Sequence, residues 1–274
     1  MLVSDKELKN LKLRSIKIGD LKDLAKSNNL TVFNNGPDTI KELMKLDHRI
    51  IDKFIKNKYK EKVRERQGLI SNTDLVSELK KVTDLTWGAV QGQLDQRIQV
   101  EYVRRYYRYD DLLANVKKTL HNTITSYVMA TWYNHWSTVL IEDYTSIHPR
   151  VIPTLKNNFG IDIFFDNQPF DLKTTYLPKN FSMEKAIEDP KSLAVWMYEN
   201  QGAQRFGDDN RLFIVLIDTK NPSESWKLKR EVEFVNKKID HFFDASNVTA
   251  DDEIIFSFQN RTYTAIAKVL LITK

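Results

Sequence analysis

The chain has 274 residues, of which 41% are hydrophobic and 29% charged, so it is expected to form one large globular domain or two smaller ones. Its apolar runs, such as residues 212–217 and 269–272, are far too short to cross a bilayer, and its charged N-terminus does not look like a secretory signal, so we expect a cytoplasmic protein with no membrane span. A net charge of +5 suits a partner that carries phosphates. The absence of cysteine excludes disulfides and thiolate chemistry and leaves carboxylates and a few histidines as possible metal ligands, which favours hard cations such as Mg²⁺.

Helical periodicity dominates the chain up to about residue 142. Apolar residues recur there at intervals of three and four, which predicts amphipathic helices. The clearest series are Ile40, Leu43, Met44, Ile50, Ile51 and Phe54, and then Leu112, Val116, Leu120, Ile124 and Val128. Near the N-terminus, residues 16–32 and 39–46 also resemble a SAP motif, a small helix-extended-helix unit that binds DNA.

Segments typical of strands appear only in the second half of the chain. They are rich in Ile, Val, Phe, Tyr and Thr and cover residues 160–165, 169–176, 211–218, 253–258 and 261–272. Two helical stretches, residues 182–204 and 226–243, lie between them. We therefore expect an α/β (α+β) fold, with a helical N-terminal region over residues 1–100 that is a candidate for DNA recognition. A mixed sheet flanked by helices is expected over residues 101–274.

An acidic residue followed two positions later by lysine occurs often by chance, so this pattern alone does not indicate a catalytic site. In a helix, residues two apart point to different sides, so such a pair cannot converge on one metal ion and one phosphate. The helical part of this chain contains three such pairs: Glu7 with Lys9, Asp20 with Lys22, and Glu78 with Lys80.

Asp171 and Lys173 differ because their surroundings, GIDIFFDNQPFDLKTTYLP, are typical of two strands joined by a turn at residues 166–168. Residues two apart in a strand share a face, so Asp171 and Lys173 project together. Asp162 on the preceding strand can reach the same side. Two carboxylates and an amine that converge in this way are expected around a cation, and phosphodiester hydrolysis is the chemistry that they imply.

Two other interpretations of these residues remain open. The hairpin can be an exposed element with an ordinary ion pair. Asp218 and Lys220 form a competing pair at the end of a strand, with Asp208 and Asp209 upstream. We rank that pair lower because its upstream acids open the same strand and the following Asn-Pro indicates a turn.

The order of elements and the three positions Asp162, Asp171 and Lys173 resemble the PD-(D/E)xK nuclease superfamily, which has the restriction-endonuclease-like fold. The resemblance covers roughly residues 126–220, and Ile161 stands where the name of the motif has proline. It implies a type II restriction endonuclease that hydrolyses double-stranded DNA at a specific sequence. A homodimer is expected because cutting both strands of a palindrome needs two sites.

The resemblance also implies roles for single residues. Asp162, Asp171 and the backbone carbonyl of Leu172 would hold Mg²⁺, for which Mn²⁺ is expected to substitute. Lys173 would orient or deprotonate the attacking water. Glu142, at the end of a long helical pattern, is the candidate for an assisting carboxylate. In many members a glutamine follows on the next helix, and Gln201 or Gln204 could match it.

Arginines interleaved with tyrosines over residues 97–109 are candidates for contacts with DNA, although such a stretch also suits an ordinary helix surface. The candidates are Arg97, Arg104, Arg105 and Arg108. We expect no nucleotide cofactor, because neither a P-loop nor a GxGxxG pattern stands out. Two alternative functions remain, a repair or junction-resolving nuclease with the same core and a DNA-binding protein without catalysis.

Overall fold

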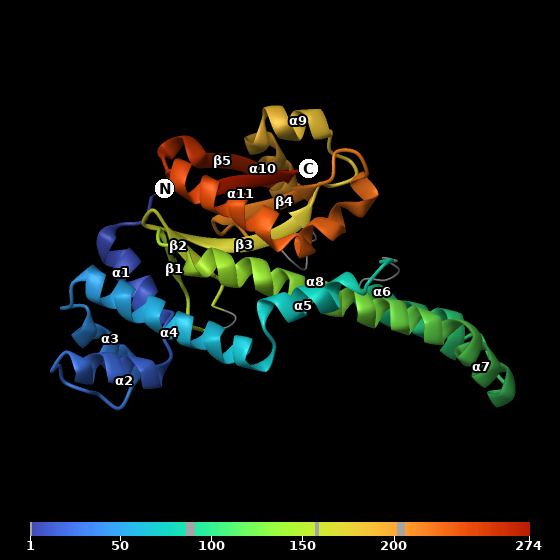
Figure 1. The fold of residues 1–274 in the computed structure, drawn as a ribbon, viewed down its shortest axis with the longest axis horizontal. Coiled ribbons are helices and arrows are strands. Elements are labelled where there is room, and N and C mark those ends of the chain that lie inside the picture. The colour runs from blue at the N-terminus through green and yellow to red at the C-terminus, as the bar shows by residue number, and fades with distance from the viewer. Residues whose placement is uncertain (1, 86–90, 157–158, 202–205) are drawn as a thin grey trace. The chain divides into compact units, whose positions relative to one another are not determined.

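The computed structural model describes residues 2–85, 91–156, 159–201 and 206–274 (Figure 1). The chain divides into two compact units, the first formed by Met1–Leu69 with Ile141–Lys274 and the second by Ile70–Leu140. This division differs from the boundary near residue 100 that periodicity suggested. The first four helices share a unit with the sheet because α4 packs against its first strand.

Four helices open the first unit: α1 (Asp5–Arg14), α2 (Ile18–Ser27), α3 (Gly36–Leu43) and α4 (His48–Leu69). Ser4 and Asn35 cap α1 and α3 by accepting backbone N–H groups, which fixes where these helices begin. Their apolar faces form a core of their own, against which Ile152 and Leu155 pack. Two helices, α2 and α3, thus lie within residues 16–46 and are joined by a segment without regular secondary structure, while the resemblance to a SAP motif and its use in DNA binding stay predictions.

The second unit consists of helical segments. They are α5 (Asn72–Lys80), α6 (Gln91–Ile98), the π-helical η1 (Gln99–Val103), α7 (Tyr109–Asn115), the π-helical η2 (Val116–Leu120) and α8 (His121–Ile147), whose last residues from Ile141 belong to the first unit. Among the described residues of the chain, no helix has both the length and the apolar character needed to cross a membrane.

A mixed sheet forms the centre of the first unit. In the described chain it has six strands: β1 (Val151–Pro153), β2 (Ile163–Phe165), β3 (Gln168–Tyr176), β4 (Arg211–Ile217), β5 (Glu253–Phe258) and β6 (Arg261–Thr273). Their spatial order is β1-β2-β3-β4-β6-β5. The β3–β4 and β4–β6 pairs are parallel and the other pairs antiparallel, so the α/β fold class with a mixed sheet is confirmed.

Helices cover both faces of this sheet, as Figure 1 shows. They are α9 (Met183–Glu188), α10 (Pro190–Glu199), the 3₁₀-helix η4 (Pro222–Arg230), α11 (Val232–Ala245) and the short 3₁₀-helix η5 (Ala250–Asp252). Every residue of β4 is buried, because Leu212, Ile214 and Leu216 pack in one core with α11, while the alternate residues pack in another with α10.

Sequence periodicity located five of these strands and missed β1, which is only three residues long. The single helix expected over residues 182–204 is interrupted at Asp189 and Pro190. Pro190 is the first residue of α10, and the Asp189 side chain accepts the backbone N–H of Ser192. A proline is favoured at the first position of a helix and disfavours helix before it, which explains the break.

The β2–β3 hairpin has a two-residue turn at Asp166 and Asn167, both with positive φ (48° and 63°). This is the backbone of a type I′ turn, whose twist matches that of the strands it joins.

We expect Asn167→Val to lower the free energy of unfolding by about 1–2 kcal/mol, because a β-branched residue is strained at positive φ, and Asn167→Gly to cause no loss. Urea denaturation of both variants measures this, and equal stability of the Val and Gly variants would contradict it.

Candidate active site

Backbone pairing of the hairpin fixes the position of Asp162. This residue directly precedes β2, and its N–H donates to the carbonyl of Phe170 (2.9 Å), while its own carbonyl accepts the N–H of Thr154 (2.9 Å). Its carboxylate turns toward β3, where Oδ2 accepts the N–H of Leu172 (2.8 Å). Three hydrogen bonds thus fix Asp162: one to Thr154, directly after β1, one to Phe170 on β3, and one from Leu172 on β3 to its side chain.

Strand alternation on β3 separates the polar side chains from the core. Phe170 and Leu172 are buried on one face, and Asp171 and Lys173 project together from the other. Lys173 Nζ lies 2.9 Å from Oδ1 and 2.8 Å from Oδ2 of Asp171. The lysine side chain is 48% exposed and the aspartate side chain 18%, so the amine can move away into solvent while the carboxylate stays in place.

Arg211 is a further charged residue at this site, which the sequence analysis did not single out. It opens β4 opposite Asp171 in the parallel ladder, and its Nε lies 3.4 Å from Asp171 Oδ2. The guanidinium donates to Gln201 Oε1 (3.0 Å) and lies 4.8 Å from the centre of the Tyr198 ring. The one sequence signal for it was an arginine at the start of an otherwise wholly apolar strand.

The surroundings of Arg211 hold it rigidly. The Gln201 amide exchanges two hydrogen bonds of 3.1 Å with the backbone of Gly207. A Cβ atom at Gly207 would stand 2.8 Å from the guanidinium, so a larger residue there would require the arginine side chain to shift. Arg211 therefore differs from Lys173: both neutralise Asp171, but only the lysine is free to leave.

Glu142 lies on α8, next to the hairpin, as the helical pattern suggested. Burial, together with the nearby charges of Asp162 and Asp143, raises its pKa to about 7, although Lys229 and Lys173 act in the opposite direction. Burial also raises the pKa of Asp162, with a contribution from Asp171, against the hydrogen bond from Leu172. The structure thus brings Glu142 near Asp162 and Lys173.

Lys229 and Asp209 are two more residues near the site that the sequence did not reveal. Lys229 in η4 is only 3% exposed, and its Nζ lies 5.2 Å from the centre of the Tyr176 ring. Burial lowers its pKa to about 8, and the charge of Glu142 opposes that shift. Burial raises the pKa of Asp209, as do Asp208 and Asp171, so this residue belongs to the surroundings of Asp171.

The donors at the hairpin fit a hard divalent cation. Asp162 and Asp171 offer carboxylate oxygens, and the carbonyl of Leu172 points to the same side as its N–H, toward Asp162, because both groups of a strand residue face one neighbour. Within the described residues, no three acidic or histidine side chains are close enough to hold a metal ion by themselves. Mg²⁺ suits such a site, since it keeps several water ligands and binds through one or two carboxylates and substrate phosphates.

The competing acid-x-lysine pairs lie elsewhere, as their periodicity indicated. Three of them fall within α1, α2 and α5. Asp218 follows β4, and its Oδ1 accepts the backbone N–H groups of Lys220 and Asn221 (3.0 and 2.8 Å). That carboxylate closes a turn, so it does not join Lys220 in a site.

The candidates for DNA contact are scattered over the two units. Arg97 pairs with Glu101 (2.8 Å), and Arg104, Arg105 and Arg108 are exposed between η1 and α7. Gln201 is engaged with Gly207 and Arg211 as described above, and Gln204 lies outside the described residues. Their role in DNA binding stays a prediction.

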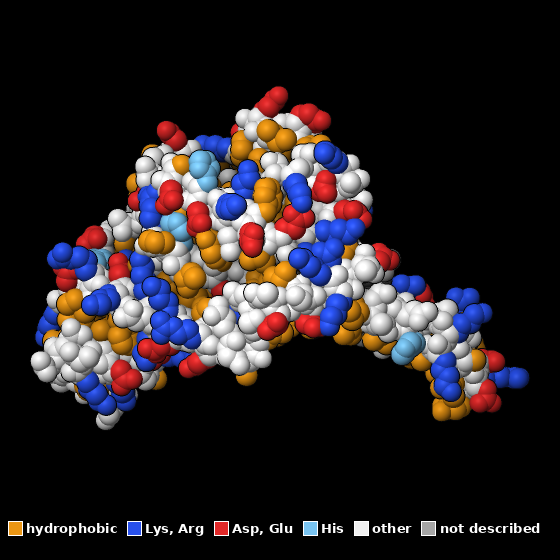
Figure 2. Space-filling model, viewed as in Figure 1, with side chains coloured by type: hydrophobic (Ala, Val, Ile, Leu, Met, Phe, Trp, Pro, Cys, Tyr) orange, Lys and Arg blue, Asp and Glu red, His pale blue; other side chains and the backbone are white. Residues whose placement is uncertain are grey.

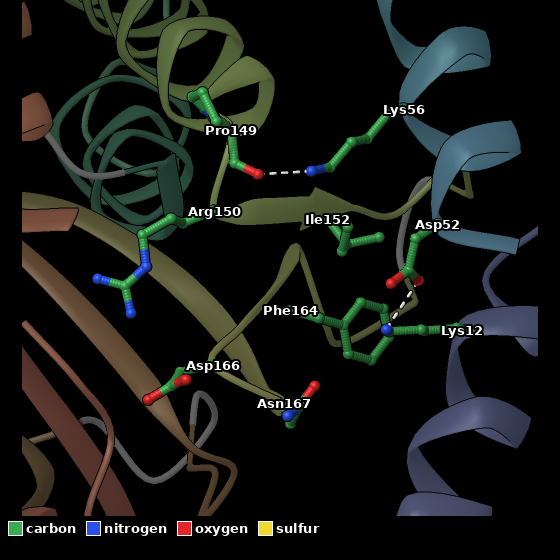
Figure 3. Close-up of a pocket in the computed structure, with 9 residues that line it drawn as sticks. All are labelled: Lys12, Asp52, Lys56, Pro149, Arg150, Ile152, Phe164, Asp166 and Asn167. Atoms are coloured by element: carbon green, nitrogen blue, oxygen red, sulfur yellow. Dashed lines mark hydrogen bonds and ion pairs between the residues drawn. The ribbon is translucent and has the colours of Figure 1, made fainter. Parts of the chain in front are cut away.

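A cavity of about 270 Å³ lies at the tip of the hairpin, away from Asp162 and Asp171 (Figure 3). Most polar groups around it already have partners: Lys12 pairs with Asp52 (2.7 Å), and Lys56 donates to the carbonyl of Pro149 (2.5 Å). On the opposite side in Figure 3, Asp166 accepts the N–H of Val248 (2.7 Å). These contacts link α1 to α4, α4 to the residues after α8, and the hairpin turn to the segment after α11, and they leave few groups for a ligand.

No protein-family model matches this chain, and no curated protein sequence or solved structure matches it either. The function must therefore be argued from the geometry of the hairpin and its surroundings.

The raised pKa of Glu142 predicts how stability depends on pH in a metal-free buffer. Its pKa is higher in the folded state than the ordinary 4.5, so the folded protein binds the proton more tightly. The free energy of unfolding should then fall as pH rises from about 4.5 to about 7, by at most about 3 kcal/mol. Glu142→Gln should be stabilised relative to the unmodified protein above this range and not below it.

Urea denaturation in EDTA at pH values on either side of that window measures the effect. The exposed Glu233 on α11 provides the matched control, since Glu233→Gln should change stability equally at both pH values. An unchanged pH dependence in Glu142→Gln would contradict the burial of this carboxyl group.

Arg211 is expected to matter for stability because its guanidinium is enclosed. Arg211→Met removes the hydrogen bond to Gln201 and the ion pair with Asp171, and should lower the free energy of unfolding by about 2 kcal/mol. Arg261→Met, at the exposed start of β6, serves as the control in the same denaturation experiment. Equal losses of stability in the two variants would show that the contacts of Arg211 stabilise the fold no more than an exposed arginine does.

Proposed function

We propose that this chain is a Mg²⁺-dependent endonuclease that hydrolyses phosphodiester bonds of double-stranded DNA, in the manner of a type II restriction enzyme. The observation that carries the proposal is the convergence of Asp162, Asp171 and Lys173 on one short hairpin. Two half-buried carboxylates with a half-exposed amine beside them suit a bound cation, which would relieve the repulsion between them and could replace the amine as the partner of Asp171.

Each residue of the site would have a separate role in the reaction. Asp162, Asp171 and the Leu172 carbonyl would hold Mg²⁺, which when bound acts as a Lewis acid and lowers the pKa of the attacking water. Lys173 would leave Asp171 and donate to the attacking water or to the phosphate, where negative charge develops. Arg211 cannot follow, so it would keep the Asp171 carboxylate oriented.

Glu142 has a supporting part in this proposal. It lies near Asp162 and Lys173, since the charges of both residues act on its pKa. A third carboxyl group there can orient water next to the two proposed ligands. The buried Lys229 behind it would balance its charge when it is ionised.

Lys173→Ala tests the proposal directly. The unmodified protein should cut long duplex DNA into discrete fragments in Mg²⁺ and not in EDTA, and Lys173→Ala should reduce the rate at least about a hundredfold. Lys220→Ala is the matched control, because Lys220 belongs to the acid-x-lysine pair that only closes a turn, and it should cut at the normal rate. Fragment patterns on gels over a time course give both rates.

Other outcomes of this experiment separate the alternatives. Cleavage restricted to branched or damaged DNA would favour a junction-resolving or repair nuclease with the same site. Tight DNA binding without cleavage under any metal condition would rule out both nucleases. Cleavage that Lys173→Ala leaves intact would place the chemistry at another site.

A further inference from the structure

Helix α4 is the most basic long helix of the first unit. It carries eight lysines and arginines against three acidic residues. Figure 2 shows lysine and arginine side chains gathered over this helix. A helix surface of this kind is ordinary when neighbouring acidic side chains neutralise its cations, so the pairing of each charge decides what the helix can bind.

Most charges of α4 already have a partner. Asp52 lies 2.7 Å from Nζ of the buried Lys12 on α1, and Glu61 lies 3.2 Å from Nζ of Lys58. The third acidic residue, Glu65, points about 100° away from its neighbour Arg64 around the helix. The cations with a partner are Arg49 with Asp47, Lys56 with the carbonyl of Pro149, Lys58 with Glu61, Lys62 with the ring of Tyr59, and Arg66 with Asp143.

The three remaining cations lie on one face of the helix. Lys53, Lys60 and Arg64 are exposed, and their side chains have no ion pair or hydrogen bond with any residue that the structure describes. Together with the exposed Asn57 they follow one another at intervals of four, three and four, which places them in one line along the helix. We call these four residues the α4 stripe. It contains neither an acidic nor an apolar side chain.

A different face of α4 is fixed next to the proposed active site. Arg66 donates through Nε and Nη2 to Oδ2 of Asp143 (3.1 and 2.9 Å), and the hydroxyl of Tyr59 donates to Oδ1 of the same residue (3.3 Å). The side chains of Arg66 and Asp143 are each only 14% exposed. Asp143 directly follows Glu142, so α4 is joined to the part of α8 that carries the assisting carboxylate.

We propose that the α4 stripe binds the sugar–phosphate backbone of duplex DNA. Two ammonium groups, a guanidinium and an amide suit phosphate oxygens, and such contacts position DNA without reading its sequence. The helix from Lys53 to Arg64 spans about 16 Å, along which each strand of B-DNA carries about five phosphates. A stripe without apolar side chains does not suit insertion into a membrane. The inference rests on the proposed nuclease function, for which it names the surface that holds the substrate.

The salt dependence of binding tests the stripe. Each phosphate contact contributes about 0.9 to the slope of log K against log salt concentration. The combined variant Lys53→Gln, Lys60→Gln and Arg64→Gln should therefore reduce this slope by about 2 to 3. At about 100 mM salt its Kd should rise at least about tenfold, by the same factor for duplexes of different sequence. Fluorescence anisotropy with labelled duplexes in EDTA, where no cleavage is expected, measures both.

A second triple variant provides the matched control. Lys185→Gln, Lys220→Gln and Lys237→Gln remove the same charge from exposed positions on α9, after β4 and on α11. This variant should reduce the slope by less than about 1, and circular dichroism checks that both variants are folded. Equal reductions in the two variants would mean that only net charge matters, which would overturn the inference.

The absence of cysteine from the chain allows the contact to be located directly. Lys60→Cys, labelled with an azidophenacyl group, should cross-link to duplex DNA on illumination. Lys237→Cys, labelled in the same way at an exposed position of α11, should cross-link much less. Equal yields from the two positions would contradict binding at the α4 stripe.

A cleavage assay with the same variants separates this inference from the proposed nuclease activity. Loss of the stripe should raise KM at least about tenfold and leave kcat unchanged, because the stripe holds the DNA away from the reacting atoms. Cleavage with an unchanged KM in the stripe variant would overturn the inference alone. Binding that depends on the stripe without any cleavage would refute the nuclease and support the stripe, and absence of duplex binding would refute both.

Discussion

The constraint on which the site depends is the confinement of like charges. Asp162, Asp171 and Glu142 lie close enough for each to raise the energy of another's ionised form, and burial adds to that cost. A protein keeps such groups together only where the fold holds them in place and counter-charges compensate. Here backbone hydrogen bonds fix the position of Asp162. Its N–H and carbonyl are both bonded to neighbouring segments of the sheet, and the N–H of Leu172 donates to its carboxylate.

The counter-charges differ in mobility, and this difference suggests how the site works. Arg211 is fixed by Gln201 and by the ring of Tyr198, and Lys229 is enclosed next to Tyr176. Lys173 alone among the three has a side chain that is half exposed. A cation that took over the neutralisation of Asp171 would release Lys173 and leave the rest of the cluster in place, so an exchange of charges would need no rearrangement of the backbone.

Local sequence predicted much of the hairpin because its signals are local. Period-two alternation separates Phe170 and Leu172 from Asp171 and Lys173, and the Asp-Asn turn fixes which residues of the two strands face each other. The same rule correctly assigned the competing pairs around Lys9, Lys22 and Lys80 to helices. The short β1 and the break at Asp189 were missed because three residues give no periodicity and one proline interrupts an otherwise continuous helical pattern.

The sequence by itself therefore determined the α/β class, the hairpin and the shared face of Asp171 and Lys173, since each depends on residues within a few positions of one another. Only the tertiary structure decided that Arg211 stands against Asp171, because the parallel pairing of β3 with β4 joins segments forty residues apart. It likewise decided that Glu142 on α8 and Lys229 in η4 lie close enough for the charge of each to affect the pKa of the other. Long-range contacts of this kind depend on how whole elements pack, which no local pattern encodes.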